Sequence, residues 1–306
     1  MQQTIPIADL QDFLSDSPTR RSAFVTTIGD ALKDIGFFAL INHDVDRALI
    51  RSAYEAAEQF FQLPESIKVR YENPALNGQR GFTRFGKEHA KNHPVPDLKE
   101  FWHVGRDANL PNLNPVEVPQ FYAIVNQLYA QLESCAAQLL KACALYLDQP
   151  ETFLSNSAID GDTILRIIHY PPIPLSANRS SLRSAPHEDI NLITLLCEAT
   201  DSGLELLQRD GQWRSIPALP GQIIVDSGDM LQHLTNGLLK STTHRVVNPD
   251  NQRTRRFSMP FFVHPKPETD LTPLAQCVAK TGGTVKFPPI TAGEYLQQRL
   301  REIGLV

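Results

Sequence analysis

After Pro150 the chain consists of short apolar runs separated by glycine, proline, aspartate and asparagine. Runs at this spacing, joined by turn-forming residues, are typical of a sandwich or barrel of antiparallel strands. The sequence therefore predicts a mainly β core, with candidate strands in the segments TILRIIHY, INLITLLC, LELLQRDGQW, QIIVDSGDML, THRVVN and FSMPFFV.

Helices are expected both before and after this core along the sequence. The spacing of apolar residues and the helix-start and helix-stop signals predict three helices before Pro150 and one near the C-terminus. They run from Ser17 to Gly36, from Asp44 or Asp46 to Leu63-Pro64, from about Val118 to Leu147, and onward from a Thr-x-x-Glu capping box at Thr291 and Glu294.

Without an internal repeat or a low-complexity tract, the chain is expected to be one domain over residues 1–306. We expect residues 1–150 to form an N-terminal helical elaboration with a few strands. Residues 151–288 would form the β core, and residues 289–306 the C-terminal helix. The fold class is thus mainly β with flanking helices, an α+β arrangement.

The pair His187 and Asp189 is the strongest chemical signal in the β-rich half. Residues two apart on a strand point to the same face, so both side chains can bind one ion, with His244 arriving from another strand. Two histidines and one carboxylate leave three coordination positions open, which suits ferrous iron that binds a substrate or cosubstrate together with dioxygen. A structural zinc site would normally show four protein ligands.

The sequence around these residues resembles the isopenicillin N synthase-like family of non-haem iron dioxygenases, most of which depend on 2-oxoglutarate. The resemblance covers almost the whole chain. It includes residues 202–248 around His244, the LRIIHYPP segment at 165–172 and the RFSMPFF strand at 256–262. In the N-terminal half it extends to the segments IPIADL, ALKDIGFFALINHDVD, FFQLPESIKVRY and DLKEFWHVG.

This resemblance implies a double-stranded β-helix, the jelly-roll fold, that uses Fe(II), 2-oxoglutarate and O2. Arg256 and Ser258 form a second two-residue pair that would face the barrel interior and bind the distal carboxylate of 2-oxoglutarate. Arg253 and Arg255 lie close enough for an error of register, but the Arg-Phe-Ser match favours Arg256. Tyr170 occupies the position whose phenol hydrogen-bonds the cosubstrate. Ile168 and His169 replace the Asn-Tyr that precedes Tyr-Pro-Pro in the plant pattern.

The function implied is a 2-oxoglutarate-dependent oxygenase that hydroxylates or desaturates a small molecule, with His187, Asp189 and His244 as catalytic metal ligands. Two alternatives remain at this point. One is an iron oxidase of the isopenicillin N synthase type, in which Arg256 and Ser258 would hold a substrate carboxylate. The other is a noncatalytic jelly-roll module for binding or sensing.

Composition restricts the classes of partner that this chain is expected to bind. A formal charge of −5 without a Lys/Arg-rich tail argues against a nucleic-acid binder. No apolar run approaches the length of a membrane span, and no secretory leader pattern opens the chain. The four cysteines lack CxxC spacing and are expected to be reduced core residues. We therefore expect a cytoplasmic enzyme with a small-molecule substrate, and the sequence predicts no oligomeric state.

A local reversal of charge suggests where that substrate binds. The segment 77–93 of this acidic chain carries four basic residues, Arg80, Arg84, Lys87 and Lys91. In the family that the chain resembles, the corresponding stretch borders the mouth of the active site, where basic side chains could steer a carboxylate. We therefore expect a carboxylate-bearing substrate that Arg80 or Arg84 contacts, with Phe262 on the apolar side of the pocket.

Overall fold

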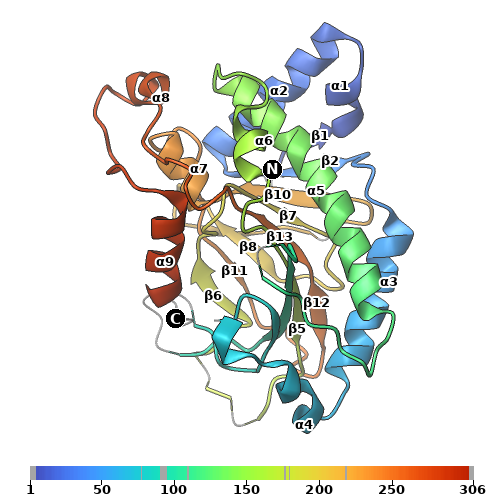
Figure 1. Ribbon diagram of the computed structural model, residues 1–306. Helices are drawn as coiled ribbons and strands as arrows, with labels where there is room; N and C mark the ends of the chain where they lie inside the picture. Colours follow the sequence, from blue (N-terminus) through green and yellow to red (C-terminus); the bar gives the residue numbers. More distant parts are fainter. Residues whose placement is uncertain are drawn as a thin grey trace.

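The computed structural model describes residues 5–76, 78–89, 95–108, 110–175, 177–178, 180–217 and 219–302. Two β-sheets form the core (Figure 1). The large sheet has the strand order β1-β2-β10-β7-β13-β5-β4-β3, and β12 also pairs with β5. Its strands are β1 (Ile7–Asp9), β2 (Phe37–Ile41), β3 (Gly81–Thr83), β4 (Glu100–Gly105), β5 (Ile164–Tyr170), β7 (Ile193–Leu196), β10 (Ile223–Ser227), β12 (Arg256–Ser258) and β13 (Pro260–Val263).

The small sheet has the strand order β6-β11-β8-β9. All strand pairs are antiparallel except the parallel pair β1 and β2. Residues of both sheets line one internal chamber, as the jelly-roll fold expected from the sequence requires. The strands are β6 (Ser184–His187), β8 (Leu204–Leu207), β9 (Trp213–Ser215) and β11 (His244–Val246).

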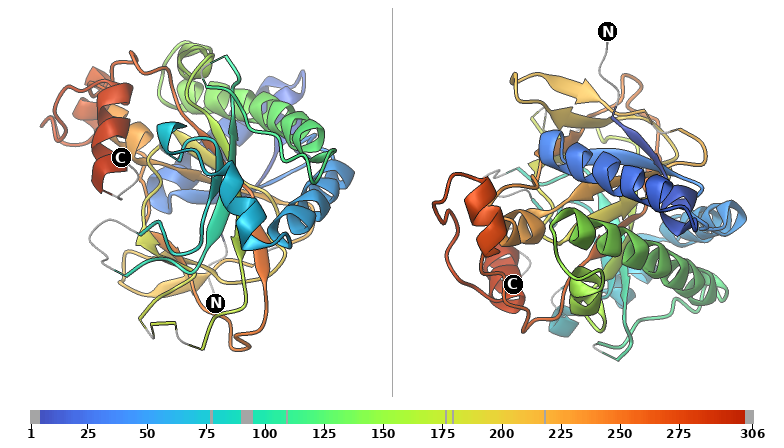
Figure 2. Two further views of the ribbon diagram at one scale, coloured as in Figure 1. Left: turned by 60° about the horizontal axis from the view of Figure 1, so that its bottom comes forward. Right: turned by 90° about the horizontal axis from the view of Figure 1, so that it is seen from above.

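Helices cover the outer face of the large sheet, and Figure 2 shows α2 and α5 running side by side across it. The α5 side chains Phe121, Val125, Leu128, Leu132 and Leu139, which recur at helical spacing, are buried. Burying each such large apolar side chain contributes about 1.5–3 kcal/mol. The helices are α1 (Leu10–Leu14), α2 (Pro18–Asp34), α3 (Arg47–Phe61), α4 (Glu65–Lys68), α5 (Phe121–Tyr146), α6 (Phe153–Ala158), α7 (Asp229–Leu234), α8 (Ala275–Lys280) and α9 (Ala292–Glu302), with 3-10 turns η1 (Val69–Tyr71) and η2 (Pro74–Leu76).

The predicted helix starts are confirmed at three caps. The hydroxyl of Ser17 accepts from the backbone N–H of Arg20, and Asp46 caps α3 by accepting from Ala48. At the last helix, Thr291 and Glu294 form the reciprocal hydrogen bonds of a capping box. Of the two candidates proposed for the second helix, Asp46 is therefore the cap.

The large sheet joins the two halves of the chain, since β1 to β4 come from the first 150 residues and its other strands from later ones. The division into 1–150, 151–288 and 289–306 stays a prediction. Among the described helices, none is both long and apolar enough to cross a membrane.

Candidate metal centre and its two cavities

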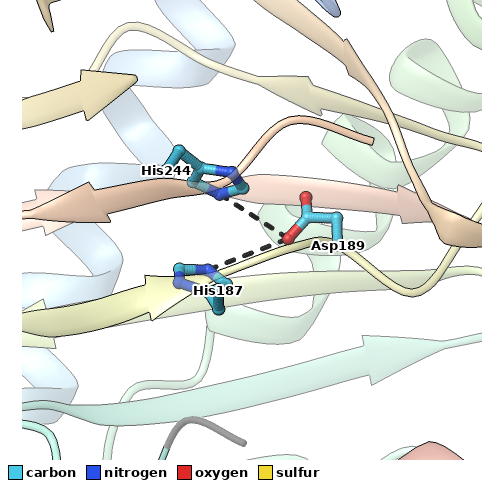
Figure 3. Close-up of side chains that lie close together, drawn as sticks. All are labelled: His187, Asp189 and His244. Atoms are coloured by element: carbon cyan, nitrogen blue, oxygen red, sulfur yellow. Dashed lines mark ion pairs between the residues drawn. The ribbon is translucent and has the colours of Figure 1, made fainter. Parts of the chain in front are cut away.

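The three predicted ligands meet between two neighbouring strands of the small sheet. His187 ends β6 and His244 begins β11, and the two residues are paired across these antiparallel strands. Asp189 Oδ1 lies 3.9 Å from His187 Nε2 and 3.7 Å from His244 Nε2 (Figure 3). One donor atom from each residue lies within 4.8 Å of the other two.

One detail differs from the sequence argument. The strand ends at His187, so Asp189 lies in the following loop and not on the same strand. Its backbone carbonyl accepts from the N–H of Asp229, at the first turn of α7, at 2.7 Å. This contact fixes the loop, so that the carboxylate turns toward the two imidazoles.

Backbone carbonyls orient both imidazoles. His187 Nδ1 lies 2.8 Å from the carbonyl oxygen of Ala185, and His244 Nδ1 lies 3.1 Å from that of Thr242. An imidazole that donates from Nδ1 keeps a lone pair on Nε2, and a metal-binding histidine is commonly oriented in this way. Both Nε2 atoms therefore face Asp189 as ligand atoms.

Neighbouring side chains orient the carboxylate of Asp189. The hydroxyl of Thr194 donates to Asp189 Oδ2, which leaves Oδ1 turned toward the imidazoles. Asp226 lies beside it in β10, and burial, together with the charge of Asp189 and a hydrogen bond with it, raises the pKa of Asp226 well above its ordinary value. A protonated Asp226 can donate to Asp189 without adding a second negative charge.

The protonation state of His187 also favours metal binding at this site. Burial, and then repulsion from His244, lowers the pKa of His187 to about 4, so its imidazole is neutral at physiological pH. Two histidines and a carboxylate are the donors of a facial triad, which fits Fe(II) with positions left for other ligands. Within the described residues, no other group of histidine, cysteine and acidic side chains meets the same geometric test.

A chamber of about 60 Å³ lies on one side of the triad, and we call it the inner chamber. Arg256, Ser258 and Tyr170 line it together with the three candidate ligands. As strand alternation predicts, Arg256 and Ser258 of β12 both face inward, and Arg256 is paired with Tyr170 on β5.

Arg256 is a buried cation without a described carboxylate partner, at 2% exposure. Its Nε donates to the carbonyl oxygen of Asp201 at 3.1 Å, whereas its Nη1 is buried and has no hydrogen-bond partner. The guanidinium carbon lies 5.0 Å from the ring centroid of Tyr170. A buried guanidinium in this condition is suited to an anionic ligand.

The neighbouring arginines are placed differently. Arg255 is exposed and pairs with Glu58 at 3.2 Å, and Arg253 is also exposed. Strand alternation thus selects Arg256 from the three. Of the two departures from the plant pattern, Ile168 lines the inner chamber, whereas His169 faces away and its Nδ1 lies 2.8 Å from Glu100 Oε1.

A second cavity, of about 200 Å³, also adjoins the triad, and we call it the outer cavity. Phe262, Ile164 and Arg166 line it together with His187 and Asp189, and residues of α9 close one side. Phe262, which was predicted to line the substrate pocket, thus lines this cavity and also the inner chamber, and its role in substrate binding stays a prediction.

Several charged residues of the outer cavity were not predicted from the sequence. Arg166 Nη1 lies 3.0 Å from Glu88 Oε1, and Lys99 Nζ lies 2.8 Å from the same oxygen and 2.8 Å from Asp97 Oδ2. Arg166 could have been found, because it is four residues before Tyr170 on one strand and so faces the same side. Glu88 lies in a loop, where no periodicity applies.

The two arginines expected at the mouth do not line the outer cavity in the described structure. Arg80 is buried, and it donates to the carbonyl oxygens of Gln79 and Arg106 at 2.7 and 3.1 Å. Arg84 is exposed and forms an ion pair with Glu72. Lys87 is exposed, and Lys91 lies outside the described residues.

Comparison with known proteins agrees with this geometry. Residues 5–123 match the family described as non-haem dioxygenase in morphine synthesis N-terminal, and residues 161–265 match the 2OG-Fe(II) oxygenase superfamily. A 2-oxoglutarate-dependent dioxygenase of Monascus ruber, citB, is 31% identical, over 88% of this chain and 87% of that protein.

Two solved structures are similar over nearly their whole length. A 2OG-Fe(II) oxygenase family protein from Caulobacter crescentus is 40% identical, with a TM-score of 0.85, over 97% of this chain and 98% of that one. A full-length protein from Neurospora crassa, solved in complex with alpha-KG and thymine, is 26% identical, with a TM-score of 0.87, over 97% and 96%. With these relatives and the triad of Figure 3, the chain belongs to the 2-oxoglutarate- and Fe(II)-dependent oxygenase superfamily.

Proposed function

We propose that His187, Asp189 and His244 ligate the catalytic Fe(II) of this oxygenase and that Arg256, Ser258 and Tyr170 bind 2-oxoglutarate in the inner chamber. The observation that carries the proposal is Arg256 Nη1, a buried donor without a partner in the same chamber as the triad. The distal carboxylate of 2-oxoglutarate would neutralise this cation, and Ser258 would add a hydroxyl donor.

The chemistry requires one bound metal and two cosubstrates. When bound, Fe(II) and 2-oxoglutarate activate O2, so that one oxygen atom enters the substrate and the other enters succinate, with release of CO2. The residues of the chain hold these partners in place. The backbone-oriented imidazoles and the carboxylate of Asp189 would hold the metal, and the two cavities adjoin these residues.

The outer cavity would then hold the substrate, a small molecule whose C–H bond faces the metal beside Phe262. We favour hydroxylation over desaturation, because a protein 29% identical to this chain, from Petromyces alliaceus, is named a proline hydroxylase. The family membership favours this oxygenase over the two other classes considered from the sequence, an oxidase without 2-oxoglutarate and a noncatalytic module.

Four buried free cysteines are consistent with the cytoplasmic location that we propose. We keep the sequence-based expectation that nucleic acids and membranes are not partners. The net charge of −5 supports the first expectation, and the lack of a membrane-spanning helix among the described helices supports the second.

The proposed function is tested by succinate formation from 2-oxoglutarate without an added substrate. Wild-type protein loaded with Fe(II) should form succinate slowly and consume O2, and a chelator should stop both. The His187→Ala variant should form none. Succinate formation that does not depend on iron, or that persists in this variant, would refute the assignment.

A further inference from the structure

The outer cavity differs from the inner chamber in the kind of polar atom that it leaves without a partner. Among the described residues that line it, Glu88 Oε2 is the buried side-chain polar atom that lacks a hydrogen-bond partner. From this acceptor we infer that the substrate is a small amide, imide or amine without net negative charge, whose N–H donates to Glu88. The inference rests on the proposed function, since it concerns the substrate of that same site.

The cations of this cavity are already neutralised. Lys99 pairs with Glu88 and Asp97, and Arg166 pairs with Glu88. At the rim, Arg299 of α9 pairs with Asp229 at 2.6 Å. Every described Lys or Arg of the lining therefore has a carboxylate partner, so its charge is already balanced without a substrate. An anionic substrate is disfavoured for this reason.

The pair of Arg166 and His103 adds no free charge. Arg166 Nε donates to His103 Nε2, and His103 Nδ1 lies 2.6 Å from the carbonyl oxygen of Gly78. Burial, and then the charge of Arg166, lowers the pKa of His103 well below its ordinary value. The imidazole is therefore neutral and accepts from Arg166, so that it offers no cation to a substrate.

Glu88 remains ionised although it is buried. Burial by itself would raise the pKa of Glu88, but Arg166 and Lys99 together hold it well below its ordinary range. Both cations contact Oε1. Oε2 therefore carries negative charge without a donor, and an unsatisfied buried acceptor is costly unless a ligand or water supplies an N–H or O–H.

The aromatic surroundings restrict the ligand further. The guanidinium of Arg166 lies between two rings, 4.2 Å from the centroid of Phe101 and 5.3 Å from that of Phe262. Phe262 also lines the cavity directly, beside Ile164. A flat or compact apolar body with one N–H group matches an apolar wall next to a single charged acceptor.

The test measures binding to the complex of the protein with Fe(II) and 2-oxoglutarate under argon, by titration calorimetry. Two sets of probes, each built on one ring system, vary the N–H groups and the charge: benzamide, N,N-dimethylbenzamide and benzoate, and thymine, 1,3-dimethylthymine and orotate. Orotate keeps the ring N–H groups but adds a carboxylate, so it tests charge alone. In at least one set, the N–H compound should bind about tenfold more tightly than its methylated and carboxylate counterparts. Equal binding within both sets, a preference for the carboxylates, or no binding at all would overturn the inference.

Because methylation also changes shape, the Glu88→Gln variant supplies the sharper comparison. Lys99 and Arg166 both need an acceptor, so the amide oxygen of the new side chain should face them and its NH2 group should face the free side. The preference for N–H compounds should then be lost or reversed. A variant that folds and keeps the wild-type preference would contradict the inference.

The Asp97→Asn variant is the matched control. It removes one negative charge from the same Lys99, but the oxygens of Asp97 already accept from Ala185, Lys99 and Ser184. Its preference among the probes should follow the wild type, and a reversal in this variant too would assign the effect to charge alone and overturn the inference.

If Glu88→Gln does not fold, a crystal structure of the wild-type complex with the probe that binds most tightly decides. A probe nitrogen at hydrogen-bond distance from Glu88 Oε2 supports the inference, and any other orientation refutes it. Succinate formation without these probes tests the proposed function separately, so the two ideas can fail independently.

Discussion

The two cavities beside the triad share Lys99, Arg166, His187, Asp189 and Phe262 but contain opposite kinds of unpaired group. The inner chamber has a donor without an acceptor, Arg256 Nη1, and the outer cavity has an acceptor without a donor, Glu88 Oε2. A buried cation without a partner is suited to an anion, whereas a neutralised set of charges with a free oxygen is suited to an N–H group. The number of basic residues near a site therefore says less about its ligand than the partners those residues already have.

The largest effect is expected at the triad, whose three residues line the inner chamber and of which His187 and Asp189 also line the outer cavity. His187→Ala, Asp189→Ala and His244→Ala should each abolish turnover, because two protein ligands rarely hold a labile divalent ion against water and buffer. Iron content and succinate formation are the measurements. His43→Asn is a control, since His43 is buried elsewhere and accepts from the N–H of Val45. A triad variant with wild-type iron content and turnover would remove that residue from the set of ligands.

The next largest effect is expected on 2-oxoglutarate binding, when Arg256 of the inner chamber is replaced. Arg256→Ala should raise the apparent constant for 2-oxoglutarate more than tenfold, since the loss of a desolvated charge partner costs about 2–5 kcal/mol. Arg256→Lys should restore binding only in part, because an ammonium cannot form the bidentate pair.

Arg255→Ala is the matched control for this change in steady-state kinetics. Arg255 is one residue away, but it is exposed and paired with Glu58. Its removal should change the constant for 2-oxoglutarate by less than twofold. A large effect of Arg255 together with a small effect of Arg256 would move the anion site out of the inner chamber.

A smaller effect is expected when the hydrogen bond from Thr194 to Asp189 is removed. Thr194→Val keeps the shape of the side chain but removes the donor to Asp189 Oδ2. Loss of such a contact to a metal ligand typically lowers metal affinity about 10–100-fold. Competition with a chelator for iron measures this change.

Thr235→Val is a control for Thr194→Val, because Thr235 is also buried and its hydroxyl donates to the carbonyl oxygen of Leu231 at 2.7 Å. It should lower thermal stability without weakening iron binding. Equal iron affinity in wild type and Thr194→Val would show that the loop alone orients Asp189.

The smallest effect is expected at the basic residues of segment 77–93. Arg84→Gln should change the apparent constant for any identified substrate by less than twofold, because Arg84 pairs with Glu72 outside the cavity. Arg80→Gln should lower the free energy of unfolding by about 1 kcal/mol through its lost backbone contacts, again without a specific effect on substrate. A several-fold rise in the substrate constant for Arg84→Gln would restore the sequence-based hypothesis of an acidic substrate steered by this segment.

The site features that could be predicted from the sequence are those set by local spacing. Strand alternation places Arg256 and Ser258 inside, and the capping signals place the starts of α2, α3 and α9. The His-x-Asp pair was expected to come together, although the strand ends before Asp189 and a loop completes the geometry.

The rest depends on contacts between distant segments. Glu88 reaches Arg166 from a loop 78 residues earlier in the chain, and no periodic pattern encodes that pairing. The basic segment misled the sequence argument because charge counting ignores partners. Both terminal nitrogens of Arg80 donate to backbone carbonyl oxygens, and Arg84 pairs with an acidic residue on a neighbouring segment.

The central claim, an anion site in the inner chamber beside the metal, is tested most directly by anaerobic titration of the ferrous protein with 2-oxoglutarate. Chelation of the metal by 2-oxoglutarate gives a weak visible charge-transfer band. We predict that the band appears in the wild type and in Arg255→Ala at similar concentrations, and that Arg256→Ala needs more than tenfold higher concentrations. A ferrous protein that develops no band, or a midpoint that Arg256→Ala leaves unchanged, would contradict the claim.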